Sequence, residues 1–218
     1  MTPSIKQRIQ SSLKLLIPMV IYMVFYMIWF YYLEQTVTTN FHLIHMKIDD
    51  YIPFCELFII PYELWFPYVA CTIVFLAFCD KEEYQNTCIF LCLGMTLFLI
   101  VSTVYPNGHD LRLAAMPRDN IFTKLVVSLQ KTDTPTNLFP SIHVYNSIGI
   151  NLGICRSHST QKHKWIRIVS SILCVLIIFS TILIKQHSVF DLLTAFICAI
   201  LFYMMVYKWK LFHRFFRK

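Results

Sequence analysis

Two histidines and an aspartate stand in a chain that is otherwise strongly apolar. His143 closes a Pro-Ser-Ile-His tetrapeptide that begins at Pro140, and His187-x-x-x-Asp191 opens another apolar run. Residues four apart share one face of a helix, so Asp191 can hold one ring nitrogen of His187 and leave the other as an oriented base or nucleophile. A second histidine facing it can protonate a leaving group. This set of residue types suits phosphoryl transfer.

A transferred phosphoryl group also needs positive charge and hydrogen-bond donors. Arg112 offers a planar guanidinium that matches phosphate oxygens, and Lys185 brings an ammonium group two residues before His187. Ser141 is predicted at the N-terminal edge of a helix, where free backbone N–H groups and the helix dipole favour an anion. We therefore expect Arg112, Ser141 and Lys185 to bind phosphate, with Arg118 as a weaker candidate.

The elements that must position these residues are predicted to be membrane helices. The 218 residues are 57% hydrophobic and only 14% charged, whereas soluble domains carry about 25% charged residues. A membrane span needs about 20 mostly apolar residues. The candidate spans lie near residues 15–33, 61–79, 87–105, 138–155, 165–184 and 189–207. We predict an all-α fold, a polytopic membrane helix bundle of about six transmembrane helices that forms a single domain over residues 1–218.

The apolar character of two stretches predicts how each lies relative to the membrane. The first apolar run is too long for a signal peptide and is expected to remain as a helix. Residues 51–60 are apolar but short and contain Pro53. An interfacial or re-entrant segment fits them better than a span.

Basic residues predict the orientation of the bundle. Of the 19 Lys and Arg residues, 13 fall in the N-terminus, the loops after the second and fourth spans, and the C-terminal tail. The other six are Lys47, Arg112, Arg118, Lys124, Lys131 and Lys185. Both termini are therefore predicted to be cytoplasmic in a multi-pass protein of the cell membrane. His143 and His187 then lie at similar depth near the extracytoplasmic face.

Composition also excludes several classes of function. The net charge of +7 comes from residues beside apolar runs, which is typical of a membrane surface and not of nucleic-acid binding. Cysteines within apolar runs behave as small hydrophobes, so we expect no disulfide framework, no metal site and no cofactor. The remaining histidines are expected to be solvated in loops or the tail: His42, His45, His109, His158, His163 and His213. Asp110 and Asp133 are expected to be loop or cap residues.

At these residues the sequence resembles the phosphatidic acid phosphatase type 2 superfamily. The family pattern Pro-Ser-Gly-His is similar to Pro140-Ser141-Ile142-His143. The pattern Ser-Arg-x5-His-x3-Asp is similar to Ser180-Thr181-x5-His187-x3-Asp191, with its spacing intact. The pattern Lys-x6-Arg-Pro is reduced to Tyr105-x6-Arg112-Leu113. Because the order, the spacings and the six-span layout agree, the resemblance covers most of the chain.

The resemblance implies roles for these residues. His187 would be the nucleophile that forms a phosphohistidine, Asp191 its partner and His143 the acid, while Arg112 and Ser141 would bind phosphate. The implied activity is that of a lipid-phosphate phosphatase at the extracytoplasmic face, with a lipid phosphate as substrate and membrane lipids around it.

The departures from the pattern leave alternatives open. Tyr105 and Thr181 stand where the family has cations, and Lys185 is a candidate replacement for one of them. A lipid phosphotransferase, similar to sphingomyelin or inositol-phosphorylceramide synthases, is therefore the alternative. A non-catalytic degenerate member or a small transporter is another, although a transporter usually shows related halves, which this sequence lacks. The plainer interpretation of His187 and Asp191 is a structural polar pair between helices.

Overall fold

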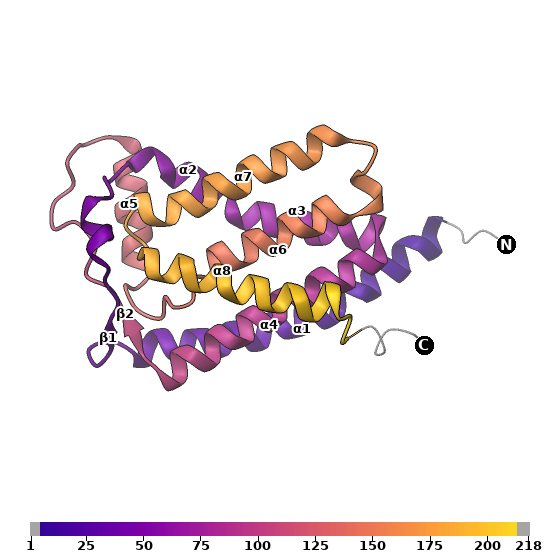
Figure 1. The fold of residues 1–218 in the computed structure, drawn as a ribbon, viewed down its shortest axis with the longest axis horizontal. Helices are drawn as coiled ribbons and strands as arrows, with labels where there is room; N and C mark the ends of the chain where they lie inside the picture. Colours follow the sequence, from indigo (N-terminus) through magenta and orange to yellow (C-terminus); the bar gives the residue numbers. More distant parts are fainter. Residues whose placement is uncertain (1–4, 213–218) are drawn as a thin grey trace.

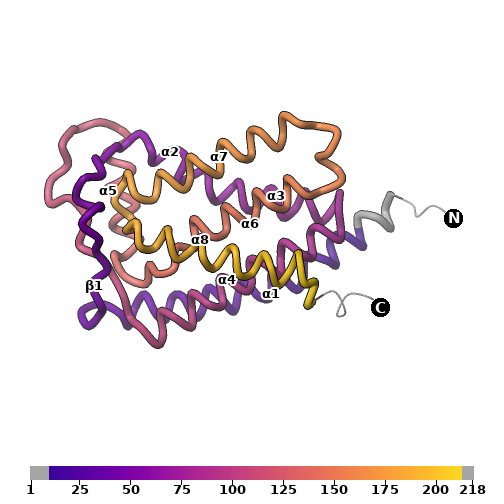
Figure 2. The backbone as a smooth tube through the Cα atoms, in the orientation of Figure 1, coloured from indigo at the N-terminus to yellow at the C-terminus, as the bar shows by residue number. Residues whose placement is uncertain are grey.

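The computed structural model describes residues 5–212, with side chains from residue 10 onward. Long helices run side by side along the longest axis of the molecule (Figures 1 and 2). They are α1 (Ile5–Thr36), α3 (Trp65–Cys79), α4 (Lys81–Val104), α6 (Ile142–Arg156), α7 (Lys164–Leu183) and α8 (Val189–Tyr203). The predicted all-α helix bundle is confirmed. His213 and the basic residues Arg214, Arg217 and Lys218 lie outside the described residues.

Short elements gather at one end of this bundle. We call it the loop end, because residues 37–58 and 105–141 lie there (Figure 1). It holds β1 (His42–Leu43), η1 (Lys47–Tyr51), η2 (Glu56–Phe58), α2 (Ile59–Glu63), β2 (Asn107–Gly108) and α5 (Ile121–Thr132). The strands β1 and β2 form one short parallel pair. We call the opposite end the terminal end. There α1 and α4 begin, α6 ends, and η3 (His158–Thr160) and the π-helical η4 (Met204–Lys208) lie.

Five helical segments of the described chain are long and apolar enough to cross a membrane. They are Gln10–Thr36, Glu56–Cys79, Lys81–Val104, Lys164–Leu183 and Val189–Lys208. The remaining predicted span corresponds to α6, which has 15 residues. At about 1.5 Å per residue it is roughly 22 Å long, shorter than the ~30 Å hydrocarbon core of a bilayer. Because α6 packs against α3, α4, α7 and α8, protein rather than lipid surrounds much of it.

Small residues let α4 and α6 approach closely at the centre of the bundle. A Cβ atom on Gly149 of α6 would lie 2.6 Å from the Phe90 ring of α4, and one on Gly94 would collide with the Tyr145 ring. Phe90 and Tyr145 stack with centroids 4.6 Å apart, and the Tyr145 hydroxyl donates to the Phe90 carbonyl at 2.8 Å. This contact fixes α6, and with it His143, against α4.

A second apolar cluster holds the loop end together. Ile59 and Tyr62 of α2, Val126 of α5 and Ile184 after α7 are each 1% exposed or less and pack against one another. The backbone N–H of Cys55 also donates to the Leu183 carbonyl at 2.9 Å. Residues 51–60, predicted as an interfacial segment, thus lie in 3-10 turns and the start of α2, packed on the end of α7.

Candidate active site

The position of His187 is set by the way in which α7 ends. The N–H of Gln186 donates to the Thr181 carbonyl at 2.9 Å, and that of Lys185 donates to Ile182 at 3.2 Å. These bonds are those of a Schellman turn, which places its C′ residue in the left-handed region. Lys185 occupies that position with a φ of 58°. The N–H of His187 also donates to Thr181, at 3.0 Å, so the backbone of the candidate nucleophile is anchored to α7.

Asp191 orients the His187 ring from the first turn of α8. Ser188 is the N-cap of that helix, and its N–H donates to Oδ2 of Asp191 at 3.0 Å, as in a capping box. The same Oδ2 lies 3.2 Å from Nδ1 of His187. When this nitrogen carries the hydrogen and donates it to Asp191, Nε2 of His187 keeps its lone pair. The i, i+4 pair expected from the sequence is therefore formed, with Asp191 fully buried.

His143 lies beside this pair on the second helical residue of α6. Its ring is held between Tyr62 of α2, at a centroid distance of 4.6 Å, and Trp65 of α3, at 4.4 Å. The centroid of the His143 ring lies 5.8 Å from that of His187. The structure thus brings His143, His187 and Asp191 together at the loop end, although the two histidines are far apart in the sequence.

Ser141 caps α6 and joins it to α8. Its Oγ accepts the N–H of Val144 at 3.4 Å, and its own N–H donates to the Asp191 carbonyl at 3.4 Å. The backbone N–H groups of Ile142 and His143 have no acceptor within the helix, because they belong to its first turn. Two N–H groups and the positive end of a helix dipole therefore lie within the turn that bears His143.

Arg112 reaches the site from the loop between α4 and α5. Its Nη1 donates to the Gln130 carbonyl at 3.0 Å, and its Nη2 donates to the Asp133 carbonyl at 2.8 Å and to Oε1 of Gln186 at 2.9 Å. Nε of Arg112 is buried and makes no hydrogen bond. Burial lowers the pKa of Arg112. The guanidinium therefore links the end of α5 to the residue that precedes His187.

The other candidate cations point elsewhere. Nζ of Lys185 donates to the Asp49 carbonyl at 2.7 Å, and Arg118 forms an ion pair of 2.6 Å with Glu56. The structure does not bring the Lys185 ammonium or the Arg118 guanidinium into contact with the histidines. Lys185 instead fastens residues 47–51 to the turn between α7 and α8.

Electrostatics keep His187 neutral. Burial, and to a smaller extent the charge of Arg112, lower the pKa of His187 to about 3. A buried imidazole loses the hydration that stabilises its charged form, and a nearby cation disfavours it further. At neutral pH the ring therefore has a free lone pair, which a nucleophile requires.

His109 is a buried residue of this site that sequence reasoning missed. The expectation of a solvated loop histidine is wrong, because His109 is only 3% exposed. Its Nδ1 accepts the N–H of Leu111 at 3.0 Å, so Nε2 carries the hydrogen and donates to the Gln186 carbonyl at 3.0 Å. Burial, followed by the charges of His187 and Arg112, lowers the pKa of His109 to about 4. The only sequence signal is its place three residues before Arg112.

Gln186 and Asp49 were also missed. Gln186 is 1% exposed, its Oε1 faces Arg112, and its Nε2 has no hydrogen-bond partner. Asp49 is 2% exposed and accepts from Oγ of Ser188 at 2.6 Å and from the N–H of Val189 at 2.8 Å. Asp49 thus covers the N-terminus of α8, directly beside Asp191. Neither residue belongs to a periodic or motif-like pattern that would have indicated it.

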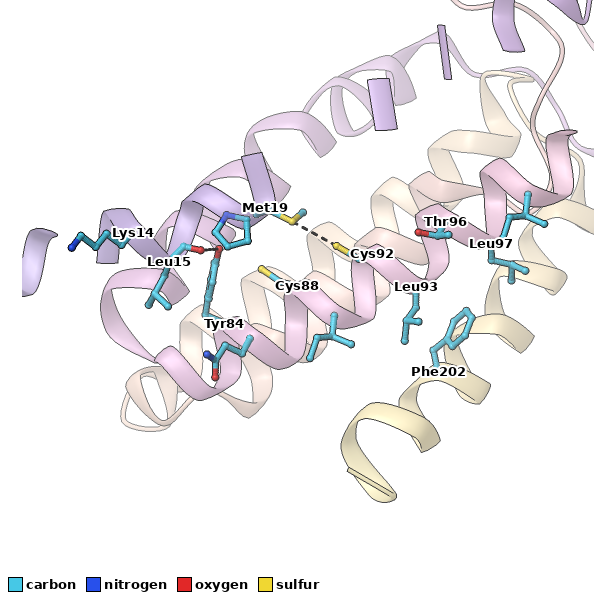
Figure 3. Close-up of a pocket in the computed structure, with 14 residues that line it drawn as sticks. Lys14, Leu15, Met19, Tyr84, Cys88, Cys92, Leu93, Thr96, Leu97 and Phe202 are labelled. Carbon is cyan, nitrogen blue, oxygen red and sulfur yellow. Dashed lines mark hydrogen bonds between the residues drawn. The ribbon is translucent and has the colours of Figure 1, made fainter. Parts of the chain in front are cut away.

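Several open cavities of the described residues lie away from His143 and His187. Figure 3 shows one of about 580 Å³ between α1, α4 and α8, with Met19, Tyr84, Cys88 and Phe202 on its walls. His187 is 4% exposed and Ser141 and Asp191 are fully buried, whereas His143 and Arg112 are only partly buried. A substrate phosphate must therefore reach a buried His187.

Comparison with known proteins agrees with the motifs. The family model described as PAP2 superfamily matches residues 117–215, which include His143, His187 and Asp191. The family resemblance that the sequence predicts is thereby confirmed. Neither the curated proteins nor the solved structures gave a match.

Proposed function

We propose that this chain, a member of the PAP2 superfamily through residues 117–215, is an integral-membrane phosphatase for a lipid phosphate. Its family and its apolar helices support lipid-phosphate chemistry of the phosphatase or phosphotransferase type. One observation carries the proposal. Nδ1 of His187 lies 3.2 Å from Oδ2 of Asp191, and the centroid of the His187 ring lies 5.8 Å from that of His143. The His187 imidazole is therefore oriented by a carboxylate and faces a second imidazole.

In the first proposed step, the lone pair on Nε2 of His187 attacks phosphorus. The bond from phosphorus to the lipid oxygen breaks, and this oxygen takes a proton from the imidazolium of His143, which the negative charge of the bound phosphate stabilises. Asp191 stabilises the positive charge that develops on the His187 ring. The lipid alcohol leaves, and the phosphoryl group remains on His187 as a phosphohistidine.

The second step returns the enzyme to its starting state. Water attacks the phosphohistidine, and His143, now neutral, accepts a proton from that water. The bond between phosphorus and Nε2 breaks, which releases inorganic phosphate and restores neutral His187. Each histidine thus regains its initial protonation state, and the cycle needs no further reactant.

The phosphoryl oxygens need donors during both steps. The free N–H groups at the start of α6, the Ser141 hydroxyl and Nε of Arg112 are the groups that we propose for this role. Lys185 adds positive charge from the same turn, with its ammonium held on the Asp49 carbonyl.

We place this site at the extracytoplasmic face and the termini in the cytoplasm. The support is the charge asymmetry, because described cations such as Lys14, Lys81, Arg156 and Lys164 belong to the terminal end. Positively charged residues favour the cytoplasmic side of a membrane protein. The candidate active site lies at the other end.

Phosphotransfer is the second candidate function, and the burial of the site favours it. Because His187, Ser141 and Asp191 are enclosed, water has limited access to a phosphohistidine. A lipid alcohol that enters beside the product would then accept the phosphoryl group in place of water.

The test is phosphate release by the purified full chain in detergent, without added metal. We expect activity on phosphatidic acid, lysophosphatidic acid or a polyprenyl diphosphate. His187→Ala and His143→Ala should each abolish it, whereas His163→Ala, at an exposed position of the terminal end, should not. With a ³²P-labelled substrate, His187 should retain label that is stable in base and released by acid.

Two results would change this conclusion. If the wild type and both histidine variants behave alike on all three substrates, the catalytic proposal is wrong. If label passes to an added alcohol faster than to water, phosphotransfer is the main reaction.

A further inference from the structure

A polar cavity of about 420 Å³ opens at the terminal end, far from His143 and His187. It lies between the start of α4, the end of α6 and η4. Acidic and basic side chains share its walls: Asp80, Glu82, Glu83, Arg156, His158 and Lys210. A cavity that presents both signs of charge at one end of a membrane protein lies where lipid headgroups are found.

Three buried oxygens at this place make no hydrogen bond. They are Oε1 of Glu83, Oγ1 of Thr87 one helical turn later, and Oη of Tyr207. All three residues are at most 7% exposed. Glu83 and Thr87 are four residues apart and share one face of α4, and α4 packs against η4, which carries Tyr207. The π-helical turn Met204–Lys208 is what directs Tyr207 there, and such turns are frequent at functional sites.

Arg156 contacts only one of the two carboxylate oxygens of Glu83. Its Nε lies 3.8 Å from the other oxygen of Glu83, Oε2, and its guanidinium lies over the Tyr207 ring at 4.6 Å. The arginine thus compensates one side of the carboxylate while Oε1 remains open. Burying an unpaired carboxylate oxygen is unfavourable, and a bound donor would relieve that cost.

A primary ammonium group has the matching chemistry. It carries three N–H donors and one positive charge, and the site offers three acceptor oxygens, one of them anionic. A quaternary ammonium group has no N–H and cannot make these bonds. Arg156, His158 and Lys210 lie in the same cavity and suit a phosphate linked to that ammonium.

An apolar groove adjoins this cavity. It measures about 280 Å³ and lies between α6 and α8, with Leu152 and Tyr203 on its walls. Tyr203 stacks on Tyr207 at 5.3 Å, so the groove reaches the polar site. A ligand with both a zwitterionic head and a hydrocarbon chain would fill the two together.

We propose that this cavity binds the headgroup of an ethanolamine phospholipid, with its ammonium on Glu83, Thr87 and Tyr207 and one acyl chain along α6 and α8. This site is separate from the candidate active site and does not depend on catalysis.

The experiment measures thermal unfolding of the full chain in detergent with added lipid. Phosphatidylethanolamine should raise Tm by several degrees more than phosphatidylcholine with the same acyl chains. Glu83→Gln should abolish that difference, and Tyr207→Phe should reduce it. Asp119→Asn, which changes an exposed acid at the loop end, should leave it unchanged.

Three outcomes would overturn the proposal. Equal Tm shifts with the two lipids in the wild type would mean that ordered water, and not an ammonium group, binds the three oxygens. An unchanged difference in Glu83→Gln, or in Tyr207→Phe should the first variant not fold, would place the lipid elsewhere. An equal Tm shift with free ethanolamine at the same concentration would mean that the cavity binds a soluble amine and not a lipid.

Discussion

Oε1 of Gln186 accepts a hydrogen bond of 2.9 Å from Nη2 of Arg112, and this bond fixes which way the Gln186 carboxamide faces. A guanidinium only donates, so the atom facing it must be the oxygen. The amide nitrogen therefore faces away from Arg112, buried and without an acceptor, in the residue directly before His187. An anion bound at His187 would supply that acceptor.

Gln186→Ala should therefore weaken binding of the phosphoryl group. A hydrogen bond to a charged group contributes about 1.5–3 kcal/mol, so kcat/KM should fall roughly 10- to 100-fold. Inhibition by vanadate should weaken in parallel. Gln186→Glu should lose more, since a carboxylate there would repel phosphate. Gln161→Ala, at an exposed position of the terminal end, is the matched control. Unaltered vanadate inhibition in Gln186→Ala would exclude this role.

Asp191→Asn should impair catalysis more than folding. Its side-chain oxygen can still accept the N–H of Ser188 and keep the cap of α8. It no longer carries the charge that stabilises a positive His187 ring, so kcat should fall by roughly 10⁴-fold, on the scale known for such aspartate–histidine pairs. Steady-state rates and Tm, measured on the same preparation, separate the two effects. A large loss of Tm with little change in kcat would make Asp191 a structural residue.

Lys185→Met tests whether the ammonium anchors a loop or attracts substrate. The hydrogen bond from Nζ to the Asp49 carbonyl holds residues 47–51 on the turn before α8. Its loss should cost about 1.5–3 kcal/mol, because the donor is charged, and lower Tm by several degrees, with KM changed less than about threefold. Lys131→Met is the control for loss of one positive charge at the loop end. A rise in KM of tenfold or more without a drop in Tm would indicate direct phosphate binding by Lys185.

Stability should decline as the solution becomes acidic. Burial lowers the pKa of His187 to about 3 and that of His109 to about 4, from 6.5 in each case. Below pH 6.5 the unfolded chain takes up protons that these folded sites exclude, so their contribution is complete above pH 6.5 and is lost toward pH 4. Asp133, whose burial raises its pKa to about 6, acts in the opposite sense between pH 3.8 and 6.

Tm measured from pH 5 to pH 8 gives the slope of stability against pH. His109→Asn should flatten it, since each such histidine contributes at most about 1.4 kcal/mol per pH unit. His158→Asn, an exposed histidine at the terminal end, should not. A slope that is the same in wild type and His109→Asn would mean that His109 is not the buried titrating group.

The sequence predicts the part of the site that depends on helical spacing. His187 and Asp191 are one helical turn apart, and Ser141 and His143 belong to the first turn of one helix, so their relative positions follow from local geometry. The opposite directions of α6 and α7 then bring the two histidines to the same end. The number and order of the long helices follow equally from runs of apolar residues.

The part that the sequence does not predict depends on loops. His109 and Asp49 lie in segments without periodicity, and their burial arises only when those segments fold onto the turn between α7 and α8. The direction of the Lys185 side chain follows from a left-handed backbone conformation at a non-glycine residue. Such a conformation is uncommon for lysine and is not apparent from its neighbours.

Arg112 has a fixed number of N–H groups, and the carbonyls of Gln130 and Asp133 at the end of α5 already occupy some of them. A phosphate that binds the free Nε uses the same guanidinium that holds these carbonyls, which couples occupancy of the site to the order of a surface helix. Linkage makes the effect mutual: an anchored α5 holds Nε in place for the anion, and a bound anion stabilises the anchor. Saturation with vanadate should therefore slow amide hydrogen exchange around residues 130–133 as well as in residues 186–191.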